Sequence, residues 1–521
     1  MPQPTIAAPT LPRQVPFIIG NEAGERFGFY GMRNVLTTFL VGWLLVSLPV
    51  GERDAAAKET FHAFVMGVYF FPLLGGWLAD RLWGRYLTIL RLSVVYTLGY
   101  ALLAASTTWS PGFDAGLFLI ALGSGGIKPC VSTFVGDQFD QHNKALAKTV
   151  FDAFYWVINF GSFFASLLIP LALTGGTEAW RPRLAFGIPG LLMALATLVF
   201  WLGRERYVRL PAAPADPHSF LAVCLTSLRA SGGGRAVLVV AVAGAVAALF
   251  TIPALGAVAG LCLSLVVLLA VGGAGAWWHL DQARGRHPDE DVEGARVVLR
   301  LLMVFALVTP FWSLFDQKAS TWVLQGEQMA LPGWSFFTTA SQLQAFNPFL
   351  VMLLIPFNQR VLFPLVGRLG LRVTPLRKMA SGIAFSGLAW VLVALLQVQV
   401  EALGHSGQQV PVLFQLAPYA LLTFGEVLVS ATGLEFAYSQ APARMKSVVA
   451  AFWSLAVTVG NLWVLVVNAT VKNPSVTRAI EAQGHSVLVS QMAFFAAFAF
   501  VAAAVFAWYA RRYVEVDYYR A

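Results

Sequence analysis

Long apolar runs recur along the whole sequence, and they limit the possible fold more than any other feature. The 521 residues are 58% hydrophobic and 12% charged, whereas a soluble domain carries roughly 25% charged residues. About fourteen runs approach the roughly 20 residues that an α-helix needs to cross a bilayer. We therefore expect an all-α polytopic membrane protein. The runs lie near 15–48, 60–79, 86–107, 113–135, 151–173, 184–203, 236–254, 255–279, 296–323, 337–359, 376–398, 411–435, 447–470 and 487–510.

Two polar stretches divide these runs into groups of six, two and six. The first reads GRERYVRLPAAPADPHS and the second DQARGRHPDEDVEGAR. The two runs between them are rich in Ala, Val and Leu and carry no charge. The predicted parts are an N-terminal tail (1–14), a six-helix bundle (15–210), a linker with two extra transmembrane helices (211–295), a second six-helix bundle (296–513) and a C-terminal tail (514–521).

Basic residues are concentrated in alternate connections between the runs. Arg81, Arg85, Arg511 and Arg512 all fall on one side when the N-terminus is placed in the cytoplasm. Because cytoplasmic loops are enriched in Lys and Arg, this pattern predicts a multi-pass protein of the cell (inner) membrane with both termini inside. The stretch MPQPTIAAPTLPRQVP lacks the apolar region of a cleaved signal peptide, so the first run is expected to direct insertion.

Several other classes of protein are disfavoured by the sequence. The net charge of +9 comes from loops rather than from a basic patch with exposed aromatics, which argues against nucleic-acid binding. Cys130, Cys224 and Cys262 have no C-x-x-C spacing and are predicted to pack in the core rather than bind metal. The sequence contains no zinc-protease motif, nucleophile elbow or phosphate loop that would indicate an enzyme. We expect a monomer in the lipid bilayer with no cofactor.

The first run contains a stripe of ionisable side chains, in the stretch NEAGERFGFYGMR. Glu22, Glu25 and Arg26 are spaced i, i+3 and i+4, so they share one face of a helix. Tyr30 and Arg33 extend that face. Each charged group would cost about 3 kcal/mol if it faced lipid at the bilayer centre, so the stripe must face protein or water.

Lys128 is a base inside the fourth run, in GSGGIKPCVSTF. It lies about 15 residues along its run and Glu25 about ten residues along the first, which places both near mid-membrane at 1.5 Å per residue. An interaction between Glu25 and Lys128 is therefore expected. The glycines lack the spacing of a nucleotide-binding loop and are predicted to allow close helix packing.

Two further positions carry ionisable groups near the membrane. Glu426, with Ser430 one turn below, lies near the middle of its run, where it either lines a cavity or is protonated and hydrogen-bonded. His62 and Asp316 lie toward the external ends of their runs and are candidates for an outer gate. A histidine at a helix end in the interface would explain His62 equally well. Acids and bases at similar depth favour a binding site over the single-sign ring of a channel.

Polar and aromatic residues elsewhere in the runs have two interpretations each. Asn159 and Asn347 are buried amides that serve a site or join helices. Tyr69, Trp312 and Trp453 belong to the core or to a cavity wall, and a core position is the default.

The sequence also resembles known families. The stretch GGWLADRLWGR resembles the loop motif of the major facilitator superfamily, whose two six-helix halves rock around a central site. Nearly the whole chain resembles the proton-dependent oligopeptide transporter family of that superfamily, in its prokaryotic form with two extra helices. The motifs that carry the resemblance are Glu22-x-x-Glu25-Arg26-Phe27, GSGGIKPCVSTFVGDQF, FYWVINFGS, FWSLFDQKASTW and GLEFAYSQAP.

The resemblance implies a symporter that imports di- and tripeptides with protons by alternating access. It implies that Arg33 and Lys128 hold the peptide carboxylate, and that Glu426 holds the amino group with Asn159 and Asn347. Tyr30, Tyr69 and Trp453 would line side-chain pockets, with Ser430 and Trp312 nearby. Glu22, Glu25, Arg26, Lys128, His62 and Asp316 would serve proton coupling and gating. Protonating Glu25 would free Lys128 for the substrate.

Two departures from the family pattern stand out. Phe29 replaces a common Tyr and removes a hydroxyl, and Lys318 replaces a commonly neutral residue, with no role assigned to it. The main alternative is a carrier of the same fold for nitrate, an amino acid or a drug. Nitrate would leave Glu426 without a cationic group to bind.

Overall fold

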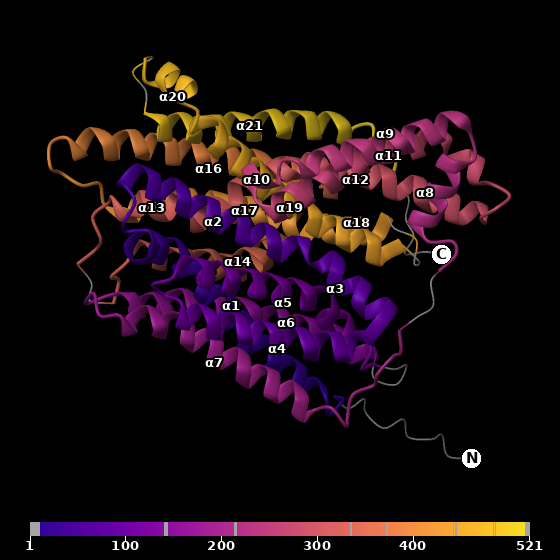
Figure 1. The fold of residues 1–521 in the computed structure, drawn as a ribbon, viewed down its shortest axis with the longest axis horizontal. Coiled ribbons are helices and arrows are strands. Elements are labelled where there is room, and N and C mark those ends of the chain that lie inside the picture. The colour runs from indigo at the N-terminus through magenta and orange to yellow at the C-terminus, as the bar shows by residue number, and fades with distance from the viewer. Residues whose placement is uncertain are drawn as a thin grey trace. The chain divides into compact units, whose positions relative to one another are not determined.

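The computed structural model describes residues 11–139, 144–212, 216–333, 336–370, 373–440, 442, 445–482, 484 and 486–515. These residues form helices joined by short connections (Figure 1), and the only β-pairings among them are isolated bridges, Arg284–His287 and Ala330–Pro411. Most of the two predicted tails and Ala441 of the last motif lie outside the described residues.

The first part of the chain, up to the second polar stretch, contains these elements: α1 (Val15–Phe39), η1 (Leu40–Leu44), α2 (Val50–Phe70), α3 (Pro72–Leu78), η2 (Ala79–Trp83), α4 (Gly84–Ala105), α5 (Ser110–Gly136), α6 (Lys144–Leu168), η3 (Ile169–Leu173), α7 (Trp180–Leu202), α8 (Phe220–Arg229), α9 (Gly232–Leu249), α10 (Ile252–Leu255), α11 (Ala257–His279) and η4 (Leu280–Ala283).

The remaining elements are α12 (Asp289–Asp316), η5 (Gln317–Ala319), α13 (Thr321–Glu327), η6 (Ala340–Ala345), α14 (Phe346–Phe357), η7 (Asn358–Leu362), α15 (Phe363–Arg368), α16 (Pro375–Gly404), η8 (Val412–Gln415), α17 (Leu416–Glu426), η9 (Val427–Ala431), α18 (Thr432–Gln440), α19 (Lys446–Val471), α20 (Pro474–Glu481) and α21 (Val487–Ala510).

The described residues include 12 stretches that are helical, long and apolar enough to cross a membrane. The longest, Glu52–Ala105, has 54 residues and covers both α2 and α4. Helix α1, with its four charged residues, is not among the 12. When the long stretch is divided and α1 is added, every predicted run corresponds to a helical crossing. The all-α, membrane-spanning fold is thereby confirmed.

The chain forms two compact units that do not follow the order of the sequence. The first unit comprises Met1–Phe39, Phe71–Ala213 and Ser341–Met352. The second comprises Leu40–Phe70, Pro214–Ala340 and Leu353–Ala521. Helix α2 belongs to the second unit because it packs on α19. The boundaries predicted for the two six-helix bundles remain predictions.

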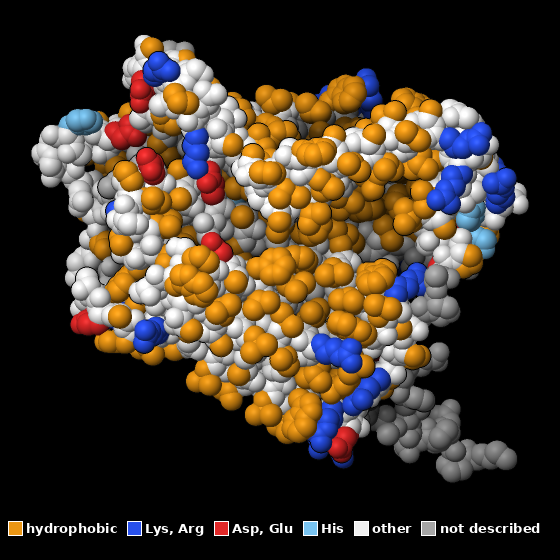
Figure 2. Space-filling view, viewed as in Figure 1, with side chains coloured by type: hydrophobic (Ala, Val, Ile, Leu, Met, Phe, Trp, Pro, Cys, Tyr) orange, Lys and Arg blue, Asp and Glu red, His pale blue; other side chains and the backbone are white. Residues whose placement is uncertain are grey.

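In the first unit, α1 packs against α6 and α7, and α4 packs against α5 and α7. In the second unit, α12 packs against α19, and α16 packs against α17 and α21. The extra helices α9 and α11 pair with each other beside α12 (Figure 1). Hydrophobic side chains cover most of the visible face over α9 and α11, whereas Lys and Arg gather at the end near α8 (Figure 2).

A close crossing of α3 and α5 depends on glycine. A Cβ atom at Gly75 would collide with the backbone of Gly126, while a Cβ atom at the neighbouring Gly76 would have no heavy atom within 4 Å. Small residues let membrane helices approach closely, so this crossing explains part of the glycine content of the predicted GGWLADRLWGR loop.

We predict opposite effects for Ala at these two adjacent glycines. Gly75→Ala should destabilise the protein by about 1–3 kcal/mol, because a methyl group has no room against Gly126. Gly76→Ala should be neutral or stabilise the helix by up to about 1 kcal/mol. Thermal unfolding of both variants in detergent tests this contrast. Equal midpoints would show that α3 and α5 do not cross this closely.

Two histidines connect the segment before α8 to the segment before α12. The Nδ1 atoms of His218 and His287 are 3.0 Å apart, and Nε2 of His287 lies 2.9 Å from the hydroxyl of Thr226 in α8. Burial and the positive charge of His218 lower the pKa of His287, partly opposed by Asp291. One of the two Nδ1 atoms must be unprotonated to accept the hydrogen bond, so this contact favours neutral imidazole.

We predict that α8 docks less tightly at low pH. Because the pKa of His287 is lowered in the folded protein, the contact is fully stabilising above about pH 6.5 and is lost as the pH falls through the lower folded value. After correction for intrinsic rates, α8 amides should exchange hydrogen faster at pH 5 than at pH 7.5. His287→Gln should remove this difference, and His405→Gln, at an exposed histidine of the same unit, should keep it. Identical pH dependence in both variants would contradict the prediction.

Candidate functional site

The charged stripe predicted on the first helix is buried in the first unit. Glu22 and Glu25 are 2% and 0% exposed, and Arg26 is 9% exposed. The Nε atom of Arg26 lies 2.6 Å from Oε1 of Glu22 and 2.9 Å from Oε2 of Glu25. One guanidinium thus bridges two carboxylates on the same helical face. Burial makes the bridge necessary, because an unpaired charge here would cost several kcal/mol.

Glu25 also has polar neighbours on two other helices of the first unit. The hydroxyl of Ser124 on α5 donates to Oε1 of Glu25 at 3.4 Å, and Tyr96 on α4 lies near Glu25. The ring of Tyr96 stacks on Tyr100 with centroids 5.1 Å apart. None of these three residues was predicted from the sequence. The only hint in the sequence was that Tyr96 and Tyr100 lie one helical turn apart in an apolar run.

Lys128 lies at the edge of the same cluster. It contributes to the electrostatic field at Glu25, and its ammonium group lies 4.8 Å from the ring centroid of Phe29. The base in direct contact with Glu25 is Arg26, and direct pairing of Glu25 with Lys128 stays a prediction. Phe29, one of the two departures from the family pattern, supplies the ring over which the ammonium lies.

Other predicted residues of the first unit lie on α1, α6 and α14. Arg33 is buried, and Tyr30 is half-buried beside Phe29 at 5.5 Å between centroids. The amide of Asn159 donates to the backbone oxygen of Tyr155 at 3.0 Å. Asn347 is 9% exposed at the start of α14.

The 3-10 turn η6, which leads into α14, is held on the first unit by amides. Gln344 donates to the backbone oxygen of Asn34 at 3.1 Å, and Gln342 donates to that of Leu167 at 3.0 Å. The amide of Asn34 also bonds the hydroxyl of Ser166. These bonds tie the segment that carries Asn347 to α1 and α6.

The second unit contains a separate buried chain of hydrogen bonds. Nδ1 of His62 lies 2.6 Å from Oδ1 of Asn461, whose Nδ2 donates to Asp316 at 2.8 Å. Nε2 of His62 lies 2.8 Å from the hydroxyl of Ser320. An amide oxygen only accepts, so Nδ1 of His62 carries a proton. The predicted His62–Asp316 pair is therefore joined through Asn461, which the sequence analysis did not single out.

A break in the helix positions this chain. Helix α12 ends at Asp316, the 3-10 turn η5 follows, and α13 restarts at Thr321, so the predicted run 296–323 is not one regular helix. The ammonium of Lys318 lies 3.3 Å from the ring centroid of Phe315, and the hydroxyl of Tyr419 donates to the backbone oxygen of Lys318.

The remaining predicted residues are buried or half-buried in the second unit. Trp312 and Trp453 are buried and meet edge to face, with centroids 6.1 Å apart. Tyr69 and Ser430 are half-buried. Glu426, also half-buried, is the last residue of α17, directly before the π-helical turn η9. Such turns inside α-helices are frequent at functional sites.

Comparison with known sequences identifies relatives over most of the chain. The model of the POT family matches residues 86–488. Peptide transporter 3 of Caenorhabditis elegans is 32% identical over 406 residues, 75% of this chain and 52% of that protein. Solute carrier family 15 member 2 of Homo sapiens is 30% identical over 416 residues, 77% of this chain and 51% of that protein. The chain spans about half the length of these curated relatives.

Solved structures extend the similarity to nearly the full chain. An autoinhibited POT family peptide transporter is 58% identical, with a TM-score of 0.93, over 98% of this chain and 99% of that one. The POT family transporter PepTSo is 56% identical, with a TM-score of 0.92, over 97% and 99% of the two chains. The predicted fold of the major facilitator type is thus confirmed, and the chain belongs to the POT family.

Proposed function

We propose that this protein is a proton-coupled symporter that imports di- and tripeptides across the cell membrane by alternating access. The observation that carries the proposal is the buried cluster of Glu22, Arg26 and Glu25 with Lys128 at its edge. Family membership and two relatives with the names peptide transporter 3 and solute carrier family 15 member 2 support it. The protein works as a monomer with both termini in the cytoplasm.

The charges in this cluster account for coupling between a proton and a peptide. With all four groups ionised, two acids and two bases sum to zero, which suits a buried site without substrate. Adding one proton to Glu25 or Glu22 leaves a net charge of +1, which the carboxylate of a peptide then neutralises. Proton and peptide therefore favour each other's binding, and the linkage is reciprocal.

Each charged end of the peptide is assigned to residues of the opposite charge. Arg33 and Lys128 bind the carboxylate, and Glu426 binds the amino group. The other contacts come from uncharged side chains that are buried or half-buried in their units: Asn159, Asn347, Tyr30, Tyr69, Trp312, Trp453 and Ser430.

The hydrogen-bonded chain of the second unit serves as a proton-sensitive gate. His62 has Asn461 at one ring nitrogen and Ser320 at the other. Adding a proton makes both nitrogens donors, so Ser320 must turn its hydroxyl from donor to acceptor. Protonation thereby changes the bonds of Ser320 at the break between α12 and α13.

We predict that Gln at Glu22 or Glu25 abolishes proton-driven accumulation of dialanine in liposomes. Moving one charge through 100 mV supplies about 2.3 kcal/mol, enough for a roughly 50-fold concentration ratio. Without a titrating carboxylate, this free energy no longer reaches the peptide. Exchange of labelled for unlabelled dialanine should persist, because it needs no net proton movement.

Glu401→Gln is the matched control, since Glu401 is a hydrogen-bonded carboxylate in the second unit outside both clusters. It should accumulate dialanine like the wild type. Normal accumulation by both Glu22→Gln and Glu25→Gln would place coupling elsewhere. Failure of wild-type uptake to respond to dialanine would favour another solute.

We also predict that Asn461→Ala changes the pH dependence of uptake. Removing the amide separates His62 from Asp316 and exposes each to a different environment. The pH profile of dialanine uptake should shift by about one unit, because hydrogen bonds to His62 and Asp316 that favour particular protonation states are lost. Asn468→Ala, a buried asparagine two turns along α19, should keep the wild-type profile. Coincident profiles for the wild type and Asn461→Ala would exclude this role.

A further inference from the structure

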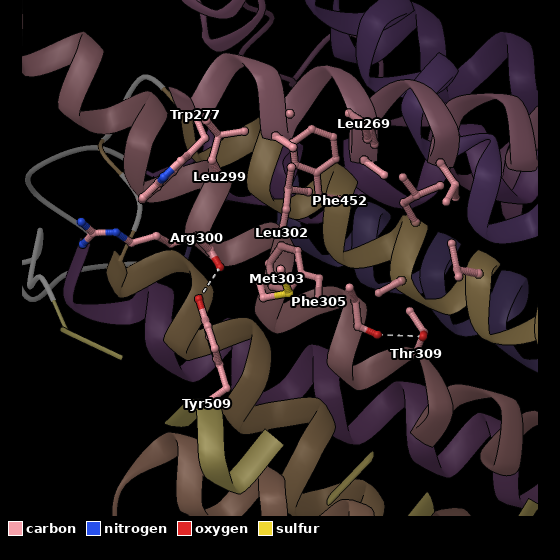
Figure 3. A pocket seen from close by; sticks show the side chains of 18 of the residues that line it. Leu269, Trp277, Leu299, Arg300, Leu302, Met303, Phe305, Thr309, Phe452 and Tyr509 are labelled. Carbon is pink, nitrogen blue, oxygen red and sulfur yellow. Dashed lines mark hydrogen bonds between the residues drawn. The ribbon is translucent and has the colours of Figure 1, made fainter. Parts of the chain in front are cut away.

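A membrane-facing groove lies in the second unit, apart from both polar clusters. It has a volume of about 710 Å³ and is bounded by α11, α12, α19 and α21. Its length is lined by apolar side chains such as Leu269, Leu302, Phe305 and Phe452 (Figure 3). The volume falls within the range of small-molecule sites, roughly 300–1,000 Å³. The lining favours an apolar occupant.

One end of the groove is polar and aromatic. Figure 3 shows Trp277, Arg300 and Tyr509 together at this end, with Thr309 near the other. The guanidinium of Arg300 lies 5.5 Å from the ring centroid of Trp277, and the hydroxyl of Tyr509 donates to the backbone oxygen of Arg300 at 3.4 Å. Tyr and Trp are enriched where a membrane meets water, so this end lies at the interface.

Arg300 differs from the arginine one turn before it. Arg296 binds Asp281 at 2.7 Å and Glu293 at 3.3 Å. Within the part of the chain that the structure describes, no carboxylate lies within ion-pair distance of Arg300. Arg511 and Arg512 follow Tyr509, and the guanidinium of Arg512 stacks on Trp508 at 4.1 Å. At this end of the groove, the positive charge of Arg300 is therefore not balanced by an ion pair with any carboxylate of the described residues.

The groove opens sideways, toward where lipid would lie. Trp278 is 79% exposed, Met303 52% and Trp463 40%, although all three line the groove. From Arg300 to Thr309 the helix rises about 14 Å, roughly half the thickness of the hydrocarbon core. An occupant would therefore lie within one leaflet, with its polar end at Arg300.

We propose that the groove binds one anionic phospholipid of the cytoplasmic leaflet. Its phosphate pairs with Arg300 at the interface, and an acyl chain lies along the apolar lining toward Thr309. Basic pockets between transmembrane helices on the cytoplasmic side recognise such headgroups. The lipid fills the space between α11 of the extra pair and α12 and α19 of the bundle, and so attaches the insertion to the transport helices.

The test measures lipid bound to the purified full-length protein by native mass spectrometry, with phosphatidylglycerol and phosphatidylcholine of equal chain length. We expect one tightly bound phosphatidylglycerol that phosphatidylcholine does not displace. Arg300→Gln should weaken binding about tenfold, the effect of losing one charge-assisted contact, while Arg300→Lys should largely retain it. Arg235→Gln, at an exposed arginine near the start of α9, should have no effect.

A second variant fills the groove without changing charge. Ala306→Trp should exclude the acyl chain and abolish retention, whereas Ala243→Trp, at an exposed alanine of α9 outside the groove, should not. If Ala306→Trp does not fold, Met303→Trp tests the same wall. Equal binding of both lipids, unchanged binding in Arg300→Gln, or a lipid-free dimer that Ala306→Trp disrupts would each overturn the proposal.

Discussion

A guanidinium held between two carboxylates inside a membrane helix is the interaction on which the site depends. Arg26 keeps Glu22 and Glu25 within 3 Å of a base in a part of the first unit that is almost fully buried. The cluster is stable only while its charges balance. In the proposed mechanism, an added proton is matched by a new negative charge, which a peptide carboxylate at Lys128 provides.

In the second unit, the predicted polar residues Asp316 and Glu426 lie where helices depart from regular geometry. The chain through His62 and Asn461 ends on Asp316 and Ser320, on either side of the break between α12 and α13. Glu426 precedes a π-helical turn. A regular helix satisfies its own backbone, so these breaks need support from neighbours. The Tyr419 hydroxyl, which donates to the backbone of Lys318, is one such support.

The sequence predicted most of the fold because lipid imposes a simple rule on it. A helix must be apolar over about 20 residues, so each predicted run corresponds to a helix. The charged residues of α1 and Lys128 were also visible, since charge inside an apolar run is rare. In contrast, Tyr96, Ser124 and Asn461 were not identified. Hydroxyls and amides are common between membrane helices, and only their contact with Glu25 or His62 distinguishes them.

Contacts far apart in the chain were also beyond prediction. Helix α2 lies in the second unit because it packs on α19. The segment from η6 into α14 lies in the first unit, where Gln342 and Gln344 of η6 bond to α6 and α1.

Charge balance in the α1 cluster is most directly tested by calorimetry of dialanine binding near neutral pH, in buffers with different ionisation enthalpies. The balance predicts uptake of about one proton per peptide, seen as a binding heat that changes with the buffer. The same heat in every buffer would contradict it.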